Sequence, residues 1–149
     1  SNFSFRIPFK TKETQTNPDK DLKLFIHQNK PVILVAEDDE LNYMYMETLF
    51  NRNGFEFFHV ENGLEAVELC KNNPKINIVF MDIKMPVMNG LEATKLIRDF
   101  RPDLPIIATT AYAQTGDEER FLSEGCNDYL SKPIRKEKLM EIIRKYAKC

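Results

Sequence analysis

Three carboxylates stand at the predicted carboxyl ends of two buried strands, where chemistry is often located. Glu37 and Asp38 follow the apolar run 32–36. Asp82 ends the run 76–82, whose β-branched and aromatic side chains indicate a strand buried on both faces. In open parallel α/β sheets, ligands bind just outside these strand ends. If the two strands are neighbours, the three acids raise one another's pKa unless a cation is present, and such oxygen ligands suit Mg2+ or Mn2+.

A structural use of these acids must be weighed against a metal site. Residues 37–40 form a run of four acids, and acids before a helix cap its free amide groups and suit its positive end. Capping is sufficient to explain Asp39 and Glu40. Four acids directly after a buried strand exceed what capping requires, so Glu37 and Asp38 remain candidate ligands.

A hydroxyl and a lysine follow two later predicted strands. Thr110 comes after the strand predicted over 105–109, and Lys132 comes after the strand predicted over 127–130. Taken singly, the hydroxyl is typical of local hydrogen bonding and the lysine of a solvated side chain. Together with the acids they form the set that phosphoryl transfer needs, which is a metal, an opposing cation and a hydrogen-bond donor.

Alternating strands and helices would position these residues from Pro31 onward. The sequence predicts strands at 32–36, 55–60, 76–82, 105–109 and 127–130 and helices at 41–52, 63–71, 90–100, 115–123 and 136–147. Single helices between strands favour a doubly wound α/β domain with a five-stranded parallel sheet. The first of these helices carries four apolar residues at helical spacing, namely Leu41, Met44, Tyr45 and Leu49.

The first thirty residues are predicted to be a tail and linker. Residues 9–30 are mostly polar and indicate a linker with at most one short helical turn. Residues 1–8 alternate apolar and polar side chains at strand period, with Phe3, Phe5 and Ile7 on one side. This stretch is either a half-buried strand without a nearby partner or a cloning remnant with a chance alternation.

Composition excludes several classes of function. The 149 residues carry 21 Lys and Arg against 23 Asp and Glu, and no basic stripe is interleaved with aromatics, so direct nucleic-acid binding is not expected. No apolar run approaches the roughly 20 residues needed to cross a bilayer, and no secretory signal is recognisable, so no membrane contact is expected. The three widely spaced cysteines favour a reducing, cytoplasmic setting. His27 and His59 stand alone and are interpreted as ordinary solvated or core-edge histidines.

Four motifs in order resemble the receiver domain of two-component response regulators. They are Glu37-Asp38, Asp82 with Met85-Pro86, Met88 and Gly90, Thr110-Ala111, and Lys132-Pro133. The resemblance covers residues 31–149 and implies one receiver domain over that range. It also implies a flavodoxin-like (β/α)5 fold with strand order 2-1-3-4-5.

The resemblance implies a role for each residue of the acidic site. Asp82 would accept a phosphoryl group from a phosphohistidine on a histidine kinase domain or a histidine phosphotransfer protein. Asp38, Asp82 and the main-chain carbonyl of Lys84 would ligate Mg2+. Glu37 stands where the family often has aspartate, and its longer side chain would act through a water on the metal. Lys132 would pair with Asp82 and then with a phosphoryl oxygen.

The family's conformational switch falls on Thr110 and Tyr129. Thr110 would move to hydrogen-bond the phosphoryl group, and Tyr129 would turn inward as it moves. An ordinary half-buried strand tyrosine is the alternative for Tyr129. Lys84 and Tyr112 occupy positions that adjust the phosphoaspartate lifetime in this family. A bulky Tyr112 would shield the acyl phosphate from water, so we expect slow hydrolysis.

A second resemblance concerns residues 1–8, which are similar to the last strand of the ATP-binding domain of sensor histidine kinases. It implies that the chain is the carboxyl-terminal receiver of a hybrid kinase, whose other domains supply ATP and phosphohistidine. The domain itself would catalyse only its own phosphorylation and slow dephosphorylation. We expect output through the face of the last two helices and the strand between them, by homodimerisation or by relay to a phosphotransfer protein.

Three other functions are alternatives to a phosphoacceptor domain. A nucleotide hydrolase is not favoured because the sequence has no Gly-x-x-x-x-Gly-Lys-[Ser/Thr] loop. Phosphatases of the haloacid dehalogenase type have Asp-x-Asp at the nucleophile, whereas Lys84 fills the second acidic place here. A receiver-like docking module that is never phosphorylated would be expected to have lost an acid, the threonine or the lysine, and none is lost. This docking module remains the alternative function.

Overall fold

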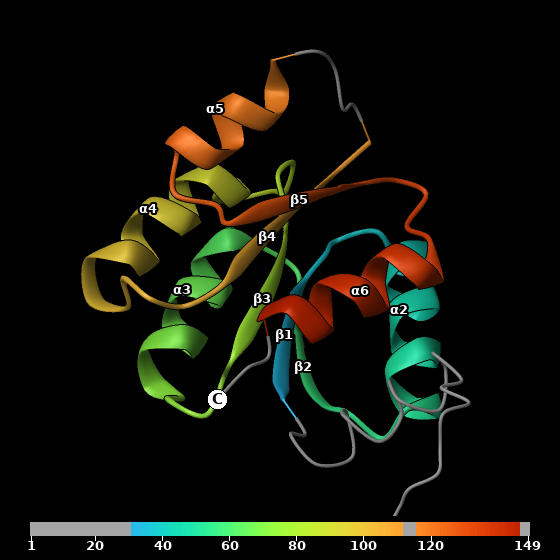
Figure 1. Cartoon of the computed structure of the whole chain (residues 1–149). Coiled ribbons are helices and arrows are strands. Elements are labelled where there is room, and N and C mark those ends of the chain that lie inside the picture. The colour runs from blue at the N-terminus through green and yellow to red at the C-terminus, as the bar shows by residue number, and fades with distance from the viewer. Residues whose placement is uncertain (1–30, 112–115, 147–149) are drawn as a thin grey trace, which may run out of the picture.

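Five parallel β-strands form a single sheet in the computed structural model, which describes residues 31–111 and 116–146 (Figure 1). The strands are β1 (Val32–Ala36), β2 (Glu56–Val60), β3 (Ile78–Asp82), β4 (Ile106–Thr110) and β5 (Asp128–Ser131). Their order across the sheet is β2-β1-β3-β4-β5, and every neighbouring pair is parallel. The predicted fold class and strand order are confirmed.

Helices cover both faces of this sheet. They are α2 (Glu40–Arg52), α3 (Gly63–Asn72), α4 (Gly90–Phe100), α5 (Asp117–Ser123) and α6 (Lys136–Tyr146). In Figure 1, α2 and α6 lie on one side of the sheet, while α3 and α4 lie on the other. The described element boundaries differ from the predicted ones by one or two residues, so Thr110 is the last residue of β4 and not the first residue after it.

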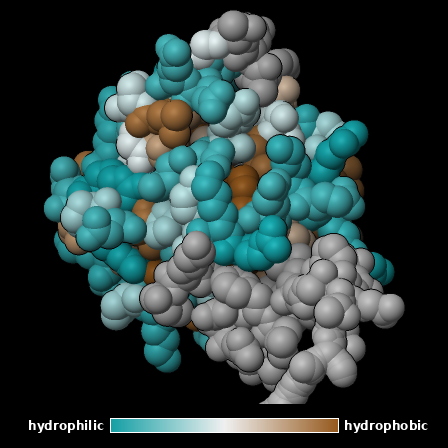
Figure 2. All heavy atoms as spheres, in the orientation of Figure 1, coloured by the Kyte–Doolittle hydropathy of each residue, from teal (hydrophilic) through white to brown (hydrophobic). Residues whose placement is uncertain are grey.

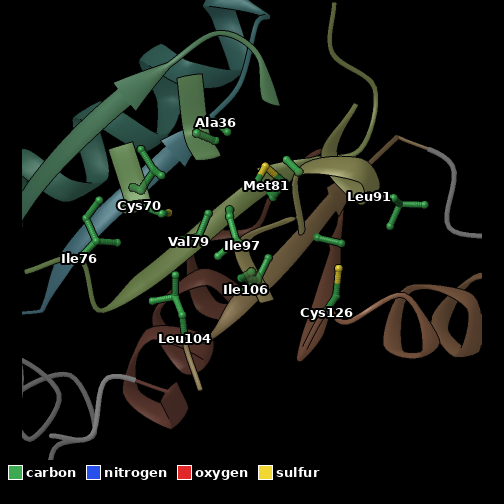
Figure 3. Packing of buried hydrophobic residues seen from close by; sticks show 14 of the residues in the cluster. Ala36, Cys70, Ile76, Val79, Met81, Leu91, Ile97, Leu104, Ile106 and Cys126 are labelled. Atoms are coloured by element: carbon green, nitrogen blue, oxygen red, sulfur yellow. The ribbon is translucent and has the colours of Figure 1, made fainter. Parts of the chain in front are cut away.

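Two hydrophobic cores follow from the alternation of side chains along β1. Ile33 and Val35 pack with α2 and α6, whereas Leu34 and Ala36 pack with α3, α4 and α5. Figure 3 shows the second core, where Val79 and Met81 of β3 lie among apolar side chains from the neighbouring strands and helices. Because β3 is buried at all five positions, its carboxyl end is held firmly where the candidate site begins.

Of the four apolar residues at helical spacing along α2, Leu49 is the one that is buried. Leu41, Met44 and Tyr45 are 77%, 52% and 42% exposed, while the residues that pack on the sheet are Met46, Leu49 and Phe50. Two adjacent stripes of α2 are apolar, and spacing alone cannot tell which one faces the sheet. Three apolar side chains of this helix therefore remain on the surface.

Several predictions concern residues outside the described ranges. The tail and linker at 1–30, the strand at 1–8 and the lifetime residue Tyr112 all fall there. No helix in 31–111 or 116–146 is both long and apolar enough to cross a membrane. The visible face in Figure 2 is largely hydrophilic, with small apolar areas.

Candidate functional site

Strand pairing brings the three carboxylates together at the carboxyl edge of the sheet. β1 lies beside β3 with Ala36 opposite Met81, so the next residues in each strand direction, Glu37 and Asp82, are neighbours. One carboxylate oxygen from each of Glu37, Asp38 and Asp82 lies within 4.8 Å of the others. Glu37 is 1% and Asp82 is 5% exposed, whereas Asp38 faces solvent. Asp38 is therefore the most exposed acid of the cluster.

A cavity of about 390 Å³ opens over this cluster. Its lining is polar and comes from the ends of β1, β3, β4 and β5, with Asp38, Asp39, Asn42, Asp82, Lys84, Thr110, Ala111 and Lys132. Asp38, Asp82, Thr110 and Lys132, which sequence spacing singled out, thus share one cavity, while Glu37 is not one of its lining residues. Asn42, from the first turn of α2, also lines the cavity, and no sequence pattern singles it out.

Lys132 bridges two of the acids. Its Nζ lies 2.8 Å from Oε1 of Glu37 and 3.3 Å from Oδ2 of Asp82. Burial lowers the pKa of Lys132, but the hydrogen bond from Glu37 and the charges of Asp82 and Glu37 raise it by more, so the net shift is upward. The lysine therefore stays charged at neutral pH. The sequence predicted a pair with Asp82 and not the shorter contact with Glu37.

One lysine does not balance three acids. Burial, followed by the hydrogen bond with Glu37 and its charge, raises the pKa of Asp82 to about 6, although Lys132 acts in the opposite direction. The pKa of Asp38 is also raised, first by burial and then through Asp82. Clustered oxygen ligands with excess negative charge are the donor set that Mg2+ prefers, so the residues present fit this ion.

Glu37 is held at four points. Its main-chain N–H donates to the carbonyl of Val60 at 3.0 Å, and its carbonyl oxygen lies 2.8 Å from Nε2 of His59. Its side chain accepts from the N–H of Asp39 at 3.3 Å and forms an ion pair with Nζ of Lys132 at 2.8 Å. Asp39 in turn caps α2 through the N–H of Asn42. These contacts fix the position of the Glu37 side chain beside Lys132 and Asp82.

The loop after β3 fixes Asp82 from the other side. The N–H of Lys84 donates to Oδ1 of Asp82 at 3.3 Å. The N–H of Gly90 donates to the carbonyl of Ile83 at 2.9 Å, and this packs the start of α4 against the end of β3. A Cβ at Gly90 would collide with the carbonyl oxygen of Asp82, so only glycine fits there. The loop from Asp82 to Gly90 therefore returns to its starting point, with Gly90 packed against the main chain of Asp82 and Ile83.

The two predicted switch residues lie in different surroundings. Thr110 is 7% exposed and lines the acidic cavity. Tyr129 is half-buried on β5, with its ring 6.3 Å from that of Phe121 in α5. It lines a second groove, of about 640 Å³, between α5, β5 and α6. Lys132 lines both the acidic cavity and this groove, so it is the residue that adjoins the two.

His59 contacts the main chain of Glu37, and Tyr43 packs on the histidine ring. The sequence predicts only an ordinary solvated or core-edge histidine at position 59. The ring of Tyr43 stacks on that of His59 with centroids 3.6 Å apart and planes 10° apart. His59 contacts the main chain of Glu37, and no side-chain pattern reports a main-chain contact between residues 22 apart. Sequence spacing could not have found this pair.

Comparisons with known proteins agree with this geometry. The family model of the response regulator receiver domain matches residues 33–144. The polar-differentiation response regulator DivK of Brucella anthropi is 39% identical over 116 residues, which are 76% of this chain and 94% of that protein. The similarity therefore extends over nearly the whole length of the relative.

Two solved structures share the fold. One is a chain in the co-crystal structure of the Saccharomyces cerevisiae histidine phosphotransfer protein Ypd1 and the receiver domain of its downstream response regulator Ssk1. It has a TM-score of 0.74 and 31% identity, covering 79% of this chain and 89% of that one. The other is the receiver domain of a Pseudomonas aeruginosa sensor histidine kinase with magnesium in its active-site cleft, with a TM-score of 0.71 and 34% identity over 78% of this chain and 97% of that one. With the family model, the relatives and the fold in agreement, the chain belongs to the response regulator receiver domains.

Proposed function

We propose that this receiver domain accepts a phosphoryl group on Asp82 in a reaction that depends on Mg2+. The observation that carries the proposal is the cluster of Glu37, Asp38 and Asp82, with Lys132 in contact with two of them. A cation opposite an acidic cluster is the arrangement that neutralises charge during phosphoryl transfer. The identity of the family and the magnesium in the Pseudomonas receiver support this assignment.

Asp82 acts as the nucleophile. A carboxyl group with a pKa of about 6 is mostly ionised at pH 7, so an oxygen of Asp82 is available to attack. That oxygen forms a bond to phosphorus, the bond between phosphorus and the imidazole nitrogen of the donor breaks, and the nitrogen keeps the electron pair. Asp82 is then an acyl phosphate until water hydrolyses it.

The surrounding residues stabilise the transferred charge. Lys132 exchanges its contact with Asp82 for one with a phosphoryl oxygen while it keeps the pair with Glu37. Thr110 donates a hydrogen bond to the phosphoryl group from its place in the same cavity. Asp38, Asp82 and the main-chain carbonyl of Lys84 would hold Mg2+. Glu37 would contact the ion through a water molecule. Mn2+ would be able to replace Mg2+. The ion supplies charge neutralisation for the phosphoryl oxygens.

The response to phosphorylation travels from Thr110 to Tyr129 and the face of α5, β5 and α6. In support of this, Lys132 adjoins both the acidic cavity and the groove that Tyr129 lines. In Figure 2, apolar residues show in a hollow on this side of the molecule, surrounded by hydrophilic ones. A change at Thr110 would alter the packing of Tyr129 against Phe121, and this face would then form a homodimer or bind a partner.

The phosphodonor docks beside the acidic cavity on α2. Leu41, Met44 and Tyr45 are exposed apolar residues of this helix, and Asn42 of the same turn lines the cavity. Exposed apolar side chains at this position suit the helix of a histidine kinase domain or a histidine phosphotransfer protein. Met44→Ser should weaken transfer from such a donor while acetyl phosphate still phosphorylates the domain. Equal loss with both donors would contradict this docking site.

The parent protein is proposed to be a hybrid histidine kinase, on the pattern of residues 1–8. Those residues lie outside the described ranges, as does Tyr112, which is proposed to slow hydrolysis of the acyl phosphate. A phosphoaspartate lifetime that Tyr112→Ala leaves unchanged would remove that role from the tyrosine.

Intact mass after incubation with acetyl phosphate and Mg2+ tests the proposed function. The wild type should gain one phosphate, and the gain should vanish with EDTA and in Asp82→Asn. Asp103→Asn is the matched control, because this exposed acid lies at the opposite edge of the sheet and should leave the gain unchanged. A gain that survives Asp82→Asn would refute the proposal, and no gain with any phosphodonor would favour the docking module.

A further inference from the structure

We infer that His59 and Tyr43 are positioning residues for the acidic pair, and that they act through the main-chain carbonyl of Glu37. The inference rests on the proposed function, because it concerns how the acids are held for a metal ion. Neither residue lines the acidic cavity, so neither is proposed to touch the ion or the phosphoryl group. Their contribution is the orientation of the segment that carries Glu37 and Asp38.

The contact between His59 and Glu37 fixes one peptide unit. Nε2 of His59 lies 2.8 Å from the carbonyl oxygen of Glu37, and a carbonyl oxygen only accepts, so Nε2 carries the hydrogen and donates it. The N–H of Glu37 donates to the carbonyl of Val60, the next residue of β2. Both main-chain polar groups of Glu37 are thus bound to the end of β2. The peptide that joins Glu37 to Asp38 cannot rotate without losing the His59 contact.

Tyr43 fixes the histidine ring and joins it to α2. The two rings are stacked face to face, and both side chains are half-buried. The tyrosine hydroxyl donates to Oε2 of Glu47 at 3.2 Å, and the N–H of Tyr43 donates to the carbonyl of Asp39 at 3.0 Å. The ring stack therefore ties β2 to the first turn of the helix that begins directly after the acids.

This arrangement clamps the acidic pair between two elements. The segment from Glu37 to Asp39 is bound to β2 on one side through His59 and to α2 on the other, and its side chains must meet Lys132 and Asp82. Loss of the imidazole donor frees the carbonyl of Glu37 and lets the peptide reorient. Outer groups that orient metal ligands commonly change metal affinity by 10-fold or more. Because His59 acts through the main chain, we expect a loss of about 5- to 10-fold.

The test compares three variants by isothermal titration with Mg2+ alone. His59→Phe keeps a ring to stack on Tyr43 but removes the donor, and it should weaken Mg2+ binding by about 5- to 10-fold. His59→Gln keeps an N–H donor at the end of its side chain and should stay within about 2-fold of the wild type. Tyr43→Phe keeps the stacked ring and should also stay within about 2-fold. Thermal unfolding of each variant reports any general loss of stability.

Two results would overturn the inference. One is an unchanged Mg2+ affinity in His59→Phe. The other is a similar loss in His59→Phe and His59→Gln that follows their melting temperatures, because this would mean that the histidine only stabilises the fold. The proposed function is tested separately by phosphorylation of the wild type. If the wild type binds Mg2+ but is not phosphorylated, the proposed function is wrong, and the titrations still decide the role of His59 and Tyr43. If the wild type does not bind Mg2+, both the proposed function and this inference are wrong.

Discussion

At the amino edge of the sheet polar side chains bind mainly the main chain, whereas at the carboxyl edge charged side chains also pair with one another. Oδ1 of Asn77 accepts the N–H of Val32 at 2.8 Å, and Oδ1 of Asn127 accepts that of Ile106 at 2.9 Å. Both asparagines come directly before a strand and continue its hydrogen bonding to the neighbouring strand. At the amino edge, these side chains complete the sheet.

Two arginines extend this arrangement. Nε of Arg98 donates to the carbonyl of Gly125 at 2.8 Å, and its guanidinium also reaches the carbonyl of Leu104 and the side chain of Asn127. Arg101 donates to the carbonyl of Ile76 at 2.7 Å. Each guanidinium donates to neutral acceptors, most of them main-chain carbonyls. Such contacts stabilise the fold and provide no reactive group.

The carboxyl edge lacks this balance. Three acids gather around one lysine, and Asp82 has a pKa raised to about 6 by burial and by Glu37. Buried like charges reduce stability and are found where function needs them. Charged groups that alter one another's pKa thus mark the reactive edge of the sheet. Charged groups that bind mainly the main chain stabilise the opposite edge.

The largest expected effect is at the carboxyl edge. Lys132→Met should lower the free energy of unfolding of the metal-free protein by about 3–5 kcal/mol at pH 8, because it leaves Glu37 and Asp82 buried without a counter-charge. Mg2+ should restore more stability to this variant than it adds to the wild type. Urea denaturation with and without Mg2+ measures both values. Lys145→Met, at an exposed lysine that contacts Asp128, should leave stability almost unchanged.

A smaller effect without metal dependence is expected at the amino edge. Arg98→Met should lower the free energy of unfolding by about 2–3 kcal/mol, because several carbonyls lose a charged donor. The loss should be the same with and without Mg2+, and phosphorylation of the folded fraction should not change. Arg144→Met, at an exposed position of α6, is the control. A Mg2+-dependent loss in Arg98→Met would break the distinction between the two edges.

The smallest effect is the pH dependence that Asp82 contributes. Its pKa is raised from 3.8 to about 6 in the folded state, so the folded protein binds this proton more tightly than the unfolded chain. The contribution is fully present below about pH 4 and is lost as the pH rises through about 6. The metal-free wild type should therefore lose about 2 kcal/mol relative to Asp82→Asn between these limits.

Urea denaturation of the wild type and Asp82→Asn across this pH range provides the comparison. At pH 7 the variant should be the more stable of the two without metal, even though it cannot be phosphorylated. If the free energies of unfolding of the two proteins change with pH in the same way, the pKa of Asp82 is not raised in the folded state.

Most residues of the acidic site can be predicted from the sequence, because they lie at the ends of predicted strands. Acids at the ends of the first and third strands, a threonine at the end of the fourth and a lysine after the fifth can be read in order, and parallel pairing collects such residues at one edge. The same logic cannot reveal contacts made through the main chain. His59 meets the carbonyl of Glu37, and Arg98 meets the carbonyl of Gly125, and neither acceptor has a side-chain signal.

The sequence by itself determined the alternation of strands and helices, the fold class and the residue types at the strand ends, because these depend on local hydrophobic period and chain order. Only the tertiary structure decided which stripe of α2 is buried, that Lys132 contacts Glu37 more closely than Asp82, and that Tyr129 lines a groove beside α5. These features depend on the rotation of a helix on its sheet and on distances between elements far apart in the chain. Local pattern does not encode either quantity, because each is set by the packing of the whole domain.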